Sequence, residues 1–261
     1  MVKGFAVWVL ALALGASSAA AEPMTVKQIS QTLFKARPGS APDFSHADLG
    51  GLDLSDLDFK GAKLTGADLY GANLARANLA GADLSGASID HTIITTTNFT
   101  GANLERATLY GAAAYSTLDA RKASEAPVFA GANLSGALIM APLARVDFRG
   151  ANLSHLRTTS GRSRLEWILW GDFSGCNFSG ANLTAAELPQ ARLSFAKFVK
   201  ADLTGAILAG ADLSHADLTG ANLAGADLTG ADLDGAVLKG VTGLDQAKGL
   251  DAAKNREKAI Y

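Results

Sequence analysis

Carboxylates are the most numerous side chains capable of acid–base chemistry in this chain, which has 261 residues and 25 Asp and Glu. Catalysis by a carboxylate pair needs a concave, desolvated setting that shifts one pKa away from the other. Most of the aspartates instead precede the central leucine or phenylalanine of five-residue units such as residues 226–230, Ala-Asp-Leu-Thr-Gly. So regular a spacing distributes the carboxylates along exposed rows, where an ion pair contributes at most about 1 kcal/mol. We therefore predict no catalytic carboxylates and no enzyme activity.

Histidine and the other residues typical of catalytic or metal sites follow the same spacing. The four histidines, His46, His91, His155 and His215, all stand where most units have glycine. Zinc ligands must converge within about 2.1 Å of one ion, which dispersed positions do not favour. Glycine recurs once per unit rather than in a phosphate-binding loop before a helix. The sequence predicts no cofactor and no zinc site, while weak calcium binding along rows of aspartates stays open.

The five-residue period determines which elements must carry these side chains. On an α-helix, at about 100° per residue, a step of five moves the apolar positions around the axis and forms no face. On a flat strand an odd step sends successive leucines to opposite faces. A chain that turns after every five residues satisfies the pattern, because the central Leu or Phe and the small residue two positions before it can both point inward. Successive coils would then stack about 4.8 Å apart.

The residues that carry this period resemble the pentapeptide-repeat family. The resemblance rests on the runs 62–86 and 201–235, whose units include Ala-Lys-Leu-Thr-Gly and Ala-Asp-Leu-Thr-Gly, and it covers roughly three quarters of the chain. It implies an all-β fold, a right-handed quadrilateral parallel β-helix, for residues 42–240. The handedness and the four sides of each coil follow from the resemblance.

With four units per coil, residues twenty apart lie in neighbouring coils. Two expected faces are Asp172, Arg192, Asp212 and Asp232, and Asn177, Lys197 and Asp217. Cations and asparagines among the aspartates relieve repulsion between neighbouring rungs. Only His155 and His215 are expected on one edge, three coils or about 14 Å apart, which is too far for a shared zinc ion.

The predicted core combines Leu and Phe with a narrower column of alanines. Each buried Leu contributes about 1.5–3 kcal/mol. Cys176 stands at an alanine position before Phe178 and is therefore expected to be a small buried residue. A single cysteine cannot form an internal disulfide, so stability must come from the stacking of coils.

Residues 1–21 have the features of a secretory signal peptide. Lys3 precedes an apolar run from Phe5 to Leu14, and small residues at 19–21 form a cleavage site. The run is too short to span a membrane. We expect cleavage after Ala21 and a periplasmic or secreted mature protein without a membrane span. Loss of Lys3 changes the formal charge from −2 to −3, which predicts neither a polyanion binder nor a strongly acidic mimic.

Short helical caps are expected at both ends of the solenoid. In residues 22–41, Thr25 and Gln28 have the spacing of a capping box, and Pro38 follows the helix. Its expected apolar face consists of Val26, Ile29, Leu33 and Phe34. Residues 241–261 place a few apolar side chains among charged ones, as a second helix would. Because the open ends of a solenoid invite association, dimerisation through one end is the alternative to capping.

Three irregularities interrupt the period. The central apolar positions follow one phase up to position 139 and another from position 143, so one residue is missing near Pro142. Residues 115–127 depart from the pattern, and a loop or short helix outside the column is favoured because Asp119 would otherwise point inward. Residues 156–170 also depart from it, and for them both a loop and a threaded coil stay open.

The second irregular stretch, together with two arginines just before it, carries the candidate binding residues. Exposed Trp and Arg together are typical of binding hot spots. The candidate partner-binding patch consists of Arg145, Arg149, Arg157, Arg162, Arg164, Trp167 and Trp170. The alternative is a loop whose tryptophan rings pack on the side of the column.

These observations lead to two functional hypotheses. The first is a non-enzymatic scaffold of the cell envelope, which presents a rigid β-helix surface to a protein or polymer partner. The second rests on the resemblance alone, because some pentapeptide-repeat proteins are similar in shape to duplex DNA and modulate type II topoisomerases. The signal segment and the mild charge disfavour nucleic acid as a partner and count against this second hypothesis.

Overall fold

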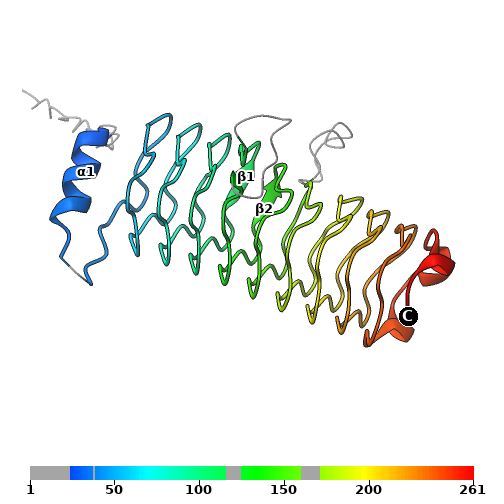
Figure 1. Cartoon of the computed structure of the whole chain (residues 1–261). Coiled ribbons are helices and arrows are strands. Elements are labelled where there is room, and N and C mark those ends of the chain that lie inside the picture. Colours follow the sequence, from blue (N-terminus) through cyan, green and yellow to red (C-terminus); the bar gives the residue numbers. More distant parts are fainter. Residues whose placement is uncertain (1–23, 38, 116–124, 160–170) are drawn as a thin grey trace, which may run out of the picture.

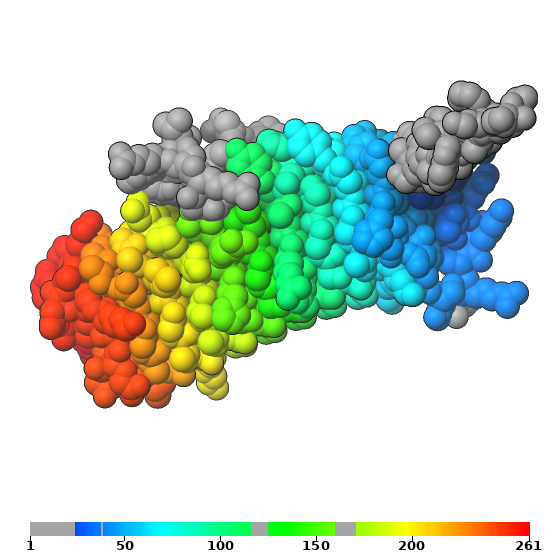
Figure 2. All heavy atoms as spheres, turned by 180° about the vertical axis from the view of Figure 1, so that it is seen from behind, coloured from blue at the N-terminus to red at the C-terminus, as the bar shows by residue number. Residues whose placement is uncertain are grey.

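The computed structural model describes residues 24–37, 39–115, 125–159 and 171–261. In this part of the chain the backbone winds into a column of stacked parallel coils, with helix α1 at one end and the C-terminus at the other (Figure 1). The solenoid expected from the five-residue period is therefore confirmed. The predicted signal peptide and most of both irregular stretches lie outside the described residues. On the face shown in Figure 2, the described coils form a rounded, continuous surface.

Each five-residue unit contributes one rung to a parallel ladder. Asp43 bridges Lys63, twenty residues later, and Asp48, Asp53 and Asp58 start three further series with the same register. Each coil therefore supplies rungs to four ladders, which we name after these first residues. Strands β1 (Thr108–Tyr110) and β2 (Leu138–Met140) extend one rung of the Asp48 ladder to three residue pairs. Most other rungs are single bridges, because the chain turns before a longer strand can form.

Backbone hydrogen bonds join neighbouring coils on both sides of a rung. Leu54 N–H donates to the carbonyl oxygen of Asn73 at 2.8 Å, and Asn73 N–H donates to the carbonyl oxygen of Leu52 at 2.9 Å. The turns are linked in the same way, since Asp56 N–H donates to the carbonyl oxygen of Ala75 at 3.0 Å. These bonds satisfy buried backbone groups without long strands.

The core is a column of buried Leu, Ile, Phe and Ala side chains, as the period predicts. Five phenyl rings stack through the middle of the molecule at centroid separations of 4.6–5.2 Å: Phe99, Phe129, Phe148, Phe178 and Phe198. Each such pair contributes about 0.5–1.5 kcal/mol beyond the burial of its area. Cys176 is buried as expected, and its thiol donates to the carbonyl oxygen of Leu143 at 2.9 Å. Burial raises the pKa of this thiol.

Helix α1 (Val26–Lys35) begins with the predicted capping box. Gln28 N–H donates to Thr25 Oγ1 at 3.3 Å, and Thr25 N–H donates to Gln28 Oε1 at 2.8 Å. Ile29 is fully buried in the core. Phe34 is 90% exposed, so its assignment to the same apolar face is wrong. It follows Ile29 by five residues, which places it about 140° away around the helix.

The C-terminal segment differs from the helical cap that we expected. Thr242, Lys248, Lys254 and Ile260 add a further rung to each of the four ladders. These rungs are six residues apart, and 3-10 helices form the turns between them. The turns are η3 (Leu244–Gln246), η4 (Leu250–Ala252) and η5 (Arg256–Lys258). The solenoid therefore continues past residue 240 by one coil with wider turns.

The two irregular stretches add residues but no rungs. Asn98 bridges Val128, and Asn152 bridges Asn182, so both pairs are thirty residues apart instead of twenty. Each stretch thus places ten additional residues between two consecutive described rungs. The missing residue near Pro142 is confirmed, since Asn133 and Asn152 pair across nineteen residues.

All three irregularities border the Asp53 ladder. The first insertion follows Ala113, the missing residue precedes Pro142, and the second insertion precedes Asp172. In the register of the ladder these three residues follow one another. Pro142 bridges Asp172, whereas no bridge joins the described residues Ala113 and Pro142, because proline has no N–H to donate. The three irregularities, which lie between residues 113 and 172 of the sequence, therefore all border the same side of the column.

Candidate functional site

Among the described residues, each five-residue unit between two rungs holds one residue in the left-handed backbone region, two positions after the central Leu, Ile or Phe. Glycine suits this region because it has no Cβ. The turns after the Asp58 ladder, which we call the Gly61 turns, have as left-handed residues Gly61, Gly81, Gly101, Gly131, Gly150, Gly180, Lys200, Gly220 and Gly240. The turns after the Asp53 ladder, which we call the Asp56 turns, have Asp56, Arg76, Thr96, Arg145, Gly175, Phe195, His215 and Gly235.

The two sets of turns differ in strain. Six of the eight described Asp56 turns hold a residue with a side chain, against one of nine Gly61 turns. The left-handed conformation costs a residue with a Cβ roughly 1–2 kcal/mol. The bulky Phe195 (φ 60°) and the β-branched Thr96 (φ 55°) are the least expected of these residues. Because such strain concentrates at functional sites, the Asp56 turns are the candidate interaction edge.

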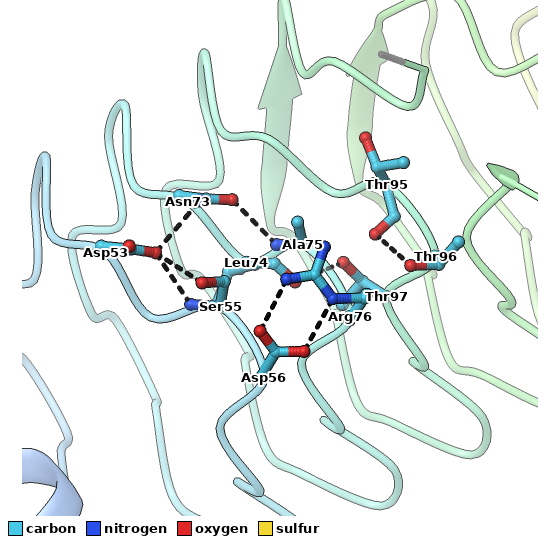
Figure 3. A network of polar contacts seen from close by, with 10 residues as sticks. All are labelled: Asp53, Ser55, Asp56, Asn73, Leu74, Ala75, Arg76, Thr95, Thr96 and Thr97. Carbon is cyan, nitrogen blue, oxygen red and sulfur yellow. Dashed lines mark hydrogen bonds and ion pairs between the residues drawn. The ribbon is translucent and has the colours of Figure 1, made fainter.

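At the N-terminal end of this edge, two side chains neutralise each other. Arg76 Nη2 lies 2.6 Å from Asp56 Oδ2, and Arg76 Nε donates to Asp56 Oδ1 at 2.7 Å (Figure 3). The hydrogen bond from Arg76 holds the pKa of Asp56 below its ordinary value. Both side chains are well exposed, so the pair contributes little to stability. It leaves this part of the edge without excess charge.

Beside this pair, Asp53 illustrates the hydrogen bonding of most ladder aspartates. Its Oδ1 accepts from Ser55 Oγ at 2.7 Å and Ser55 N–H at 3.2 Å, and from Asn73 Nδ2 in the next coil at 3.0 Å (Figure 3). The hydroxyl of Ser55, followed by its N–H, holds the pKa of Asp53 below its ordinary value. A carboxylate stabilised in its charged form and bonded to its own turn is poorly suited to act as a general base.

Farther along the Asp56 turns the surface is hollowed. A space of about 200 Å³, the Gly175 groove, is lined by Ala144, Arg145, Ser174, Gly175, Ser194 and Phe195. Phe195 is 64% exposed, and its ring stacks on His215 with a centroid separation of 5.0 Å and an interplanar angle of 18°. The missing side chain of Gly175 opens the groove between Arg145 on one side and Phe195 on the other.

A second group of aromatic rings lies on different turns, those after the Asp48 ladder. His91 contacts Tyr70 and Tyr110, with centroid separations of 5.2 Å to each. The imidazole lies over Gly111, where an added Cβ would be 2.9 Å from the ring. Here the three rings follow one another in consecutive coils.

The structure does not bring the described arginines of the predicted patch together. Arg145 belongs to the Asp56 turns, whereas Arg149 pairs with Asp147 of the Asp58 ladder at 2.7 Å. Arg157 is a rung of the Asp48 ladder. Around a coil the Asp48 and Asp58 ladders are never adjacent, so Arg149 and Arg157 share no face. Arg162, Arg164, Trp167 and Trp170 lie outside the described residues.

The expected shared edge of two histidines is wrong. His155 follows Asn152 of the Asp43 ladder, while His215 belongs to the Asp56 turns. The second insertion adds ten residues without a rung, and ten residues are half a coil. Within the described residues no three His, Cys, Asp or Glu side chains are placed to hold a metal ion. The predicted face with Asp172, Arg192, Asp212 and Asp232 is confirmed, as is that with Asn177, Lys197 and Asp217.

Sequence reasoning missed Phe195 and the Gly175 groove. The sequence did contain an indication of this site, because Phe195 is a large side chain at a position that usually holds glycine. Its alignment with Arg145 required the true register, which the insertion obscures. The described part of the chain also has no helix long and apolar enough to cross a membrane.

Comparison with known proteins gives one family. The sequence profile described as "Pentapeptide repeats (8 copies)" matches residues 43–79, 77–113, 172–210 and 206–242, which together are more than half of the chain. No curated protein gives a significant match.

Several solved structures are similar to this chain. HetL, a pentapeptide repeat protein involved in heterocyst differentiation regulation in the cyanobacterium Nostoc sp. strain PCC 7120, is 26% identical over 91% of this chain and 100% of its own, with a TM-score of 0.42. Rfr23 from the cyanobacterium Cyanothece 51142 is 30% identical over 44% of this chain and 63% of its own, with a TM-score of 0.28. QnrB1, a plasmid-mediated fluoroquinolone resistance protein, is 18% identical over 77% of this chain and 91% of its own, with a TM-score of 0.33.

Proposed function

Because the chain belongs to the pentapeptide repeat family, we propose that it is a non-enzymatic interaction scaffold, which presents the surface of its solenoid to a protein or polymer partner in the cell envelope. Stacked repeats create extended surfaces of this kind. The envelope location rests on the signal features of residues 1–21, with cleavage after Ala21. The right-handed, four-sided form of the coil belongs to the same proposal, with the four ladders as its support.

The observation that carries the proposal is the fixed order of side chains along the ladders. In the Asp43 ladder the amides form a continuous series of hydrogen bonds of 3.0–3.2 Å through Asp83, Asn103, Asn133, Asn152 and Asn182. This series runs past both insertions without a break. A partner that binds such a surface need not order it first, which lowers the entropic cost of association.

The charge of the ladders supports a partner other than a DNA-binding enzyme. The Asp43 ladder alternates Asp43 and Asp83 with Lys63, and its later rungs are asparagines with one further carboxylate, Asp202, before the last rung at Thr242. A mimic of a phosphate backbone needs closely spaced negative charges along its length. Modulation of a type II topoisomerase therefore stays the alternative, and an unchanged supercoiling activity of gyrase in the presence of the purified protein would exclude it.

Two experiments test the scaffold. Fractionation of cells that express the full chain should place it in the envelope fraction, and deletion of residues 2–21 should retain it in the cytoplasm. Recovery of both forms in the cytoplasm would contradict the envelope role. Crosslinking in envelope extract should then capture a defined partner, and replacement of Arg157, Arg162, Trp167 and Trp170 by Ala should abolish the capture. Arg106→Ala with Tyr70→Ala is the matched control, since it also removes exposed basic and aromatic side chains.

A further inference from the structure

The Gly175 groove combines two features that the repeat does not require. Phe195 holds a mostly exposed phenyl ring in a left-handed conformation that suits glycine, and Arg145 holds the same conformation (φ 61°) at the other side of the groove. Neither side chain is needed to complete the turn, because glycine forms the same turn elsewhere in the solenoid. Their placement at both sides of one gap indicates a binding site.

Backbone hydrogen bonds fix the order of the residues around the gap. Arg145 N–H donates to the carbonyl oxygen of Ser174, and Gly175 N–H donates to that of Ser194, at 2.8 Å in both cases. Phe195 therefore lies two coils beyond Arg145, with Gly175 between them. Ser194 Oγ donates to Ser174 Oγ at 3.4 Å, and both serines line the groove.

The walls of the gap have complementary chemistry. One face of the Phe195 ring is covered by His215, which in turn lies over Gly235, so the ring leans towards the following coil. Phe195 also lines the groove. The side chain of Arg145 leans in the same direction, since its Cγ is 3.4 Å from the position that a Cβ of Gly175 would occupy. The groove therefore has a π face at one side and the stem and charge of an arginine at the other.

The width of the gap selects the occupant. Two coil spacings separate the walls by about 9.6 Å, so a flat ring placed midway would lie about 4.8 Å from each wall. That separation falls within the range of about 4.5–7 Å for aromatic pairs and within about 6 Å for a cation over a ring. The space of about 200 Å³ is smaller than the roughly 300–1,000 Å³ of sites for drug-sized ligands, so it suits one side chain.

We propose that the Gly175 groove receives one aromatic side chain of a partner protein, which stacks between Phe195 and Arg145. The inserted ring would continue the stack that Phe195 and His215 already form. Aromatic and arginine anchors in a pocket are typical of the residues that dominate protein interfaces. This inference rests on the proposed scaffold function and specifies a contact of its partner, on turns that do not include Arg157.

A titration of the ¹⁵N-labelled full chain tests the groove directly. N-acetyl-L-tryptophanamide is the probe, and N-acetyl-L-leucinamide controls for general apolar contact. We expect the tryptophan probe to shift the backbone amide signals of Ser174, Gly175 and Ser194 in a saturable manner. Phe195→Gly should weaken this binding at least tenfold without unfolding the chain, because glycine fits the turn. Tyr70→Ala, which removes an aromatic ring that is 55% exposed on other turns, should leave the binding unchanged.

Three results would overturn the proposal: equal shifts with the leucine probe, unchanged affinity in Phe195→Gly, or no shift up to the solubility limit of the tryptophan probe. The titration uses purified protein, so it stays readable even if the chain proves cytoplasmic or captures no partner, which would contradict the scaffold function instead. If a captured partner binds Phe195→Gly as tightly as the unmodified chain, the groove loses its role while the scaffold stands.

Discussion

The Asp56 turns and the Gly61 turns have the same backbone but different side chains. The left-handed residues have φ values of 55–67° in the first set and 57–67° in the second. Glycine fills eight of the nine Gly61 turns and two of the eight described Asp56 turns. The geometry of the turn therefore does not dictate the residue, and the Gly61 turns show the sequence that stability alone favours.

The difference between the two sets of turns indicates where the column is best suited to bind a partner. Each side chain in the Asp56 turns adds strain of roughly 1–2 kcal/mol, which the stacked core must offset. The same turns hold the ion pair of Asp56 with Arg76, the stacked rings of Phe195 and His215, and the Gly175 groove. An edge that retains costly side chains and a groove is a better candidate for binding than an edge of glycines.

The largest expected effect comes from the core that both sets of turns share. Phe148→Ala removes a buried ring that stacks between Phe129 and Phe178, so it should lower the free energy of unfolding by about 3–5 kcal/mol. Urea denaturation followed by circular dichroism measures this loss. Phe195→Ala is the control, because its exposed ring should contribute less than about 1.5 kcal/mol. Equal losses in the two variants would show that the Asp56 turns are part of the core.

Glycine substitution should separate the two edges next. Gly101→Ala in the Gly61 turns meets no atom within 4 Å, so only the backbone strain of about 1–2 kcal/mol is expected. In Gly235→Ala the new Cβ would be 2.5 Å from His215 Nδ1, so the imidazole must also move. We expect a lower urea midpoint for Gly235→Ala than for Gly101→Ala. When His215→Gly is the reference, Gly235→Ala should lower the midpoint only as much as Gly101→Ala does in the unmodified chain, and a larger loss would assign the difference to another cause.

Replacement of a left-handed residue by glycine, the reverse of the substitutions above, should stabilise the chain instead of destabilising it. Thr96→Gly releases a β-branched residue from φ 55°, so a gain of about 1–2 kcal/mol is offset by about 0.5–1 kcal/mol from the flexibility of glycine in the unfolded chain. We expect a net stabilisation below about 1.5 kcal/mol, measured as a higher urea midpoint. Lys200→Gly in the Gly61 turns is the matched control and should also stabilise. A loss of stability in Thr96→Gly alone would show that Thr96 makes contacts that outweigh its strain.

The five-residue period correctly predicted those parts of the fold in which each regular unit stacks on the next in the same way. It placed Cys176 in the core and Asp172, Arg192 and Asp212 on one face, because any residue that keeps the phase keeps its direction. It could not predict how many rungs an irregular stretch contributes. An insertion of ten residues preserves the five-residue phase and still shifts all later residues by half a coil. The error in pairing His155 with His215 arises from this ambiguity.

The candidate site could not be predicted for the same reason, because the sequence does not show how many rungs the second insertion contributes. Phe195 and Arg145 align in one column only after the second insertion is known to add no rung. The wider C-terminal coil left a clearer trace, since Gly-Leu-Asp occurs at residues 243–245 and again at 249–251, a six-residue spacing that the five-residue pattern concealed. Local periodicity thus specifies the direction of each side chain, whereas the neighbours of a side chain depend on how many residues each coil contains.

The smallest expected effect concerns the charged part of the Asp56 turns. The hydrogen bond from Arg76 lowers the pKa of Asp56 in the folded chain, relative to an ordinary value near 3.9. A carboxyl with a lowered folded pKa stabilises the fold above its unfolded pKa, and this contribution is lost as the pH falls through the folded value. The advantage of the unmodified chain over Asp56→Asn should therefore be present at pH 7 and decline below about pH 4.

Urea midpoints at pH 7 and at pH 2.5, in low and high salt, measure this decline. The difference between the unmodified chain and Asp56→Asn should be small at pH 7, because both partners are exposed, and smaller still in high salt. Lys200→Ala changes a residue of the Gly61 turns without removing a carboxylate, so it should give the same difference at both pH values. If Asp56→Asn behaves like Lys200→Ala, the ion pair does not bias the fold, and the chemical contrast between the two edges is confined to the Gly175 groove.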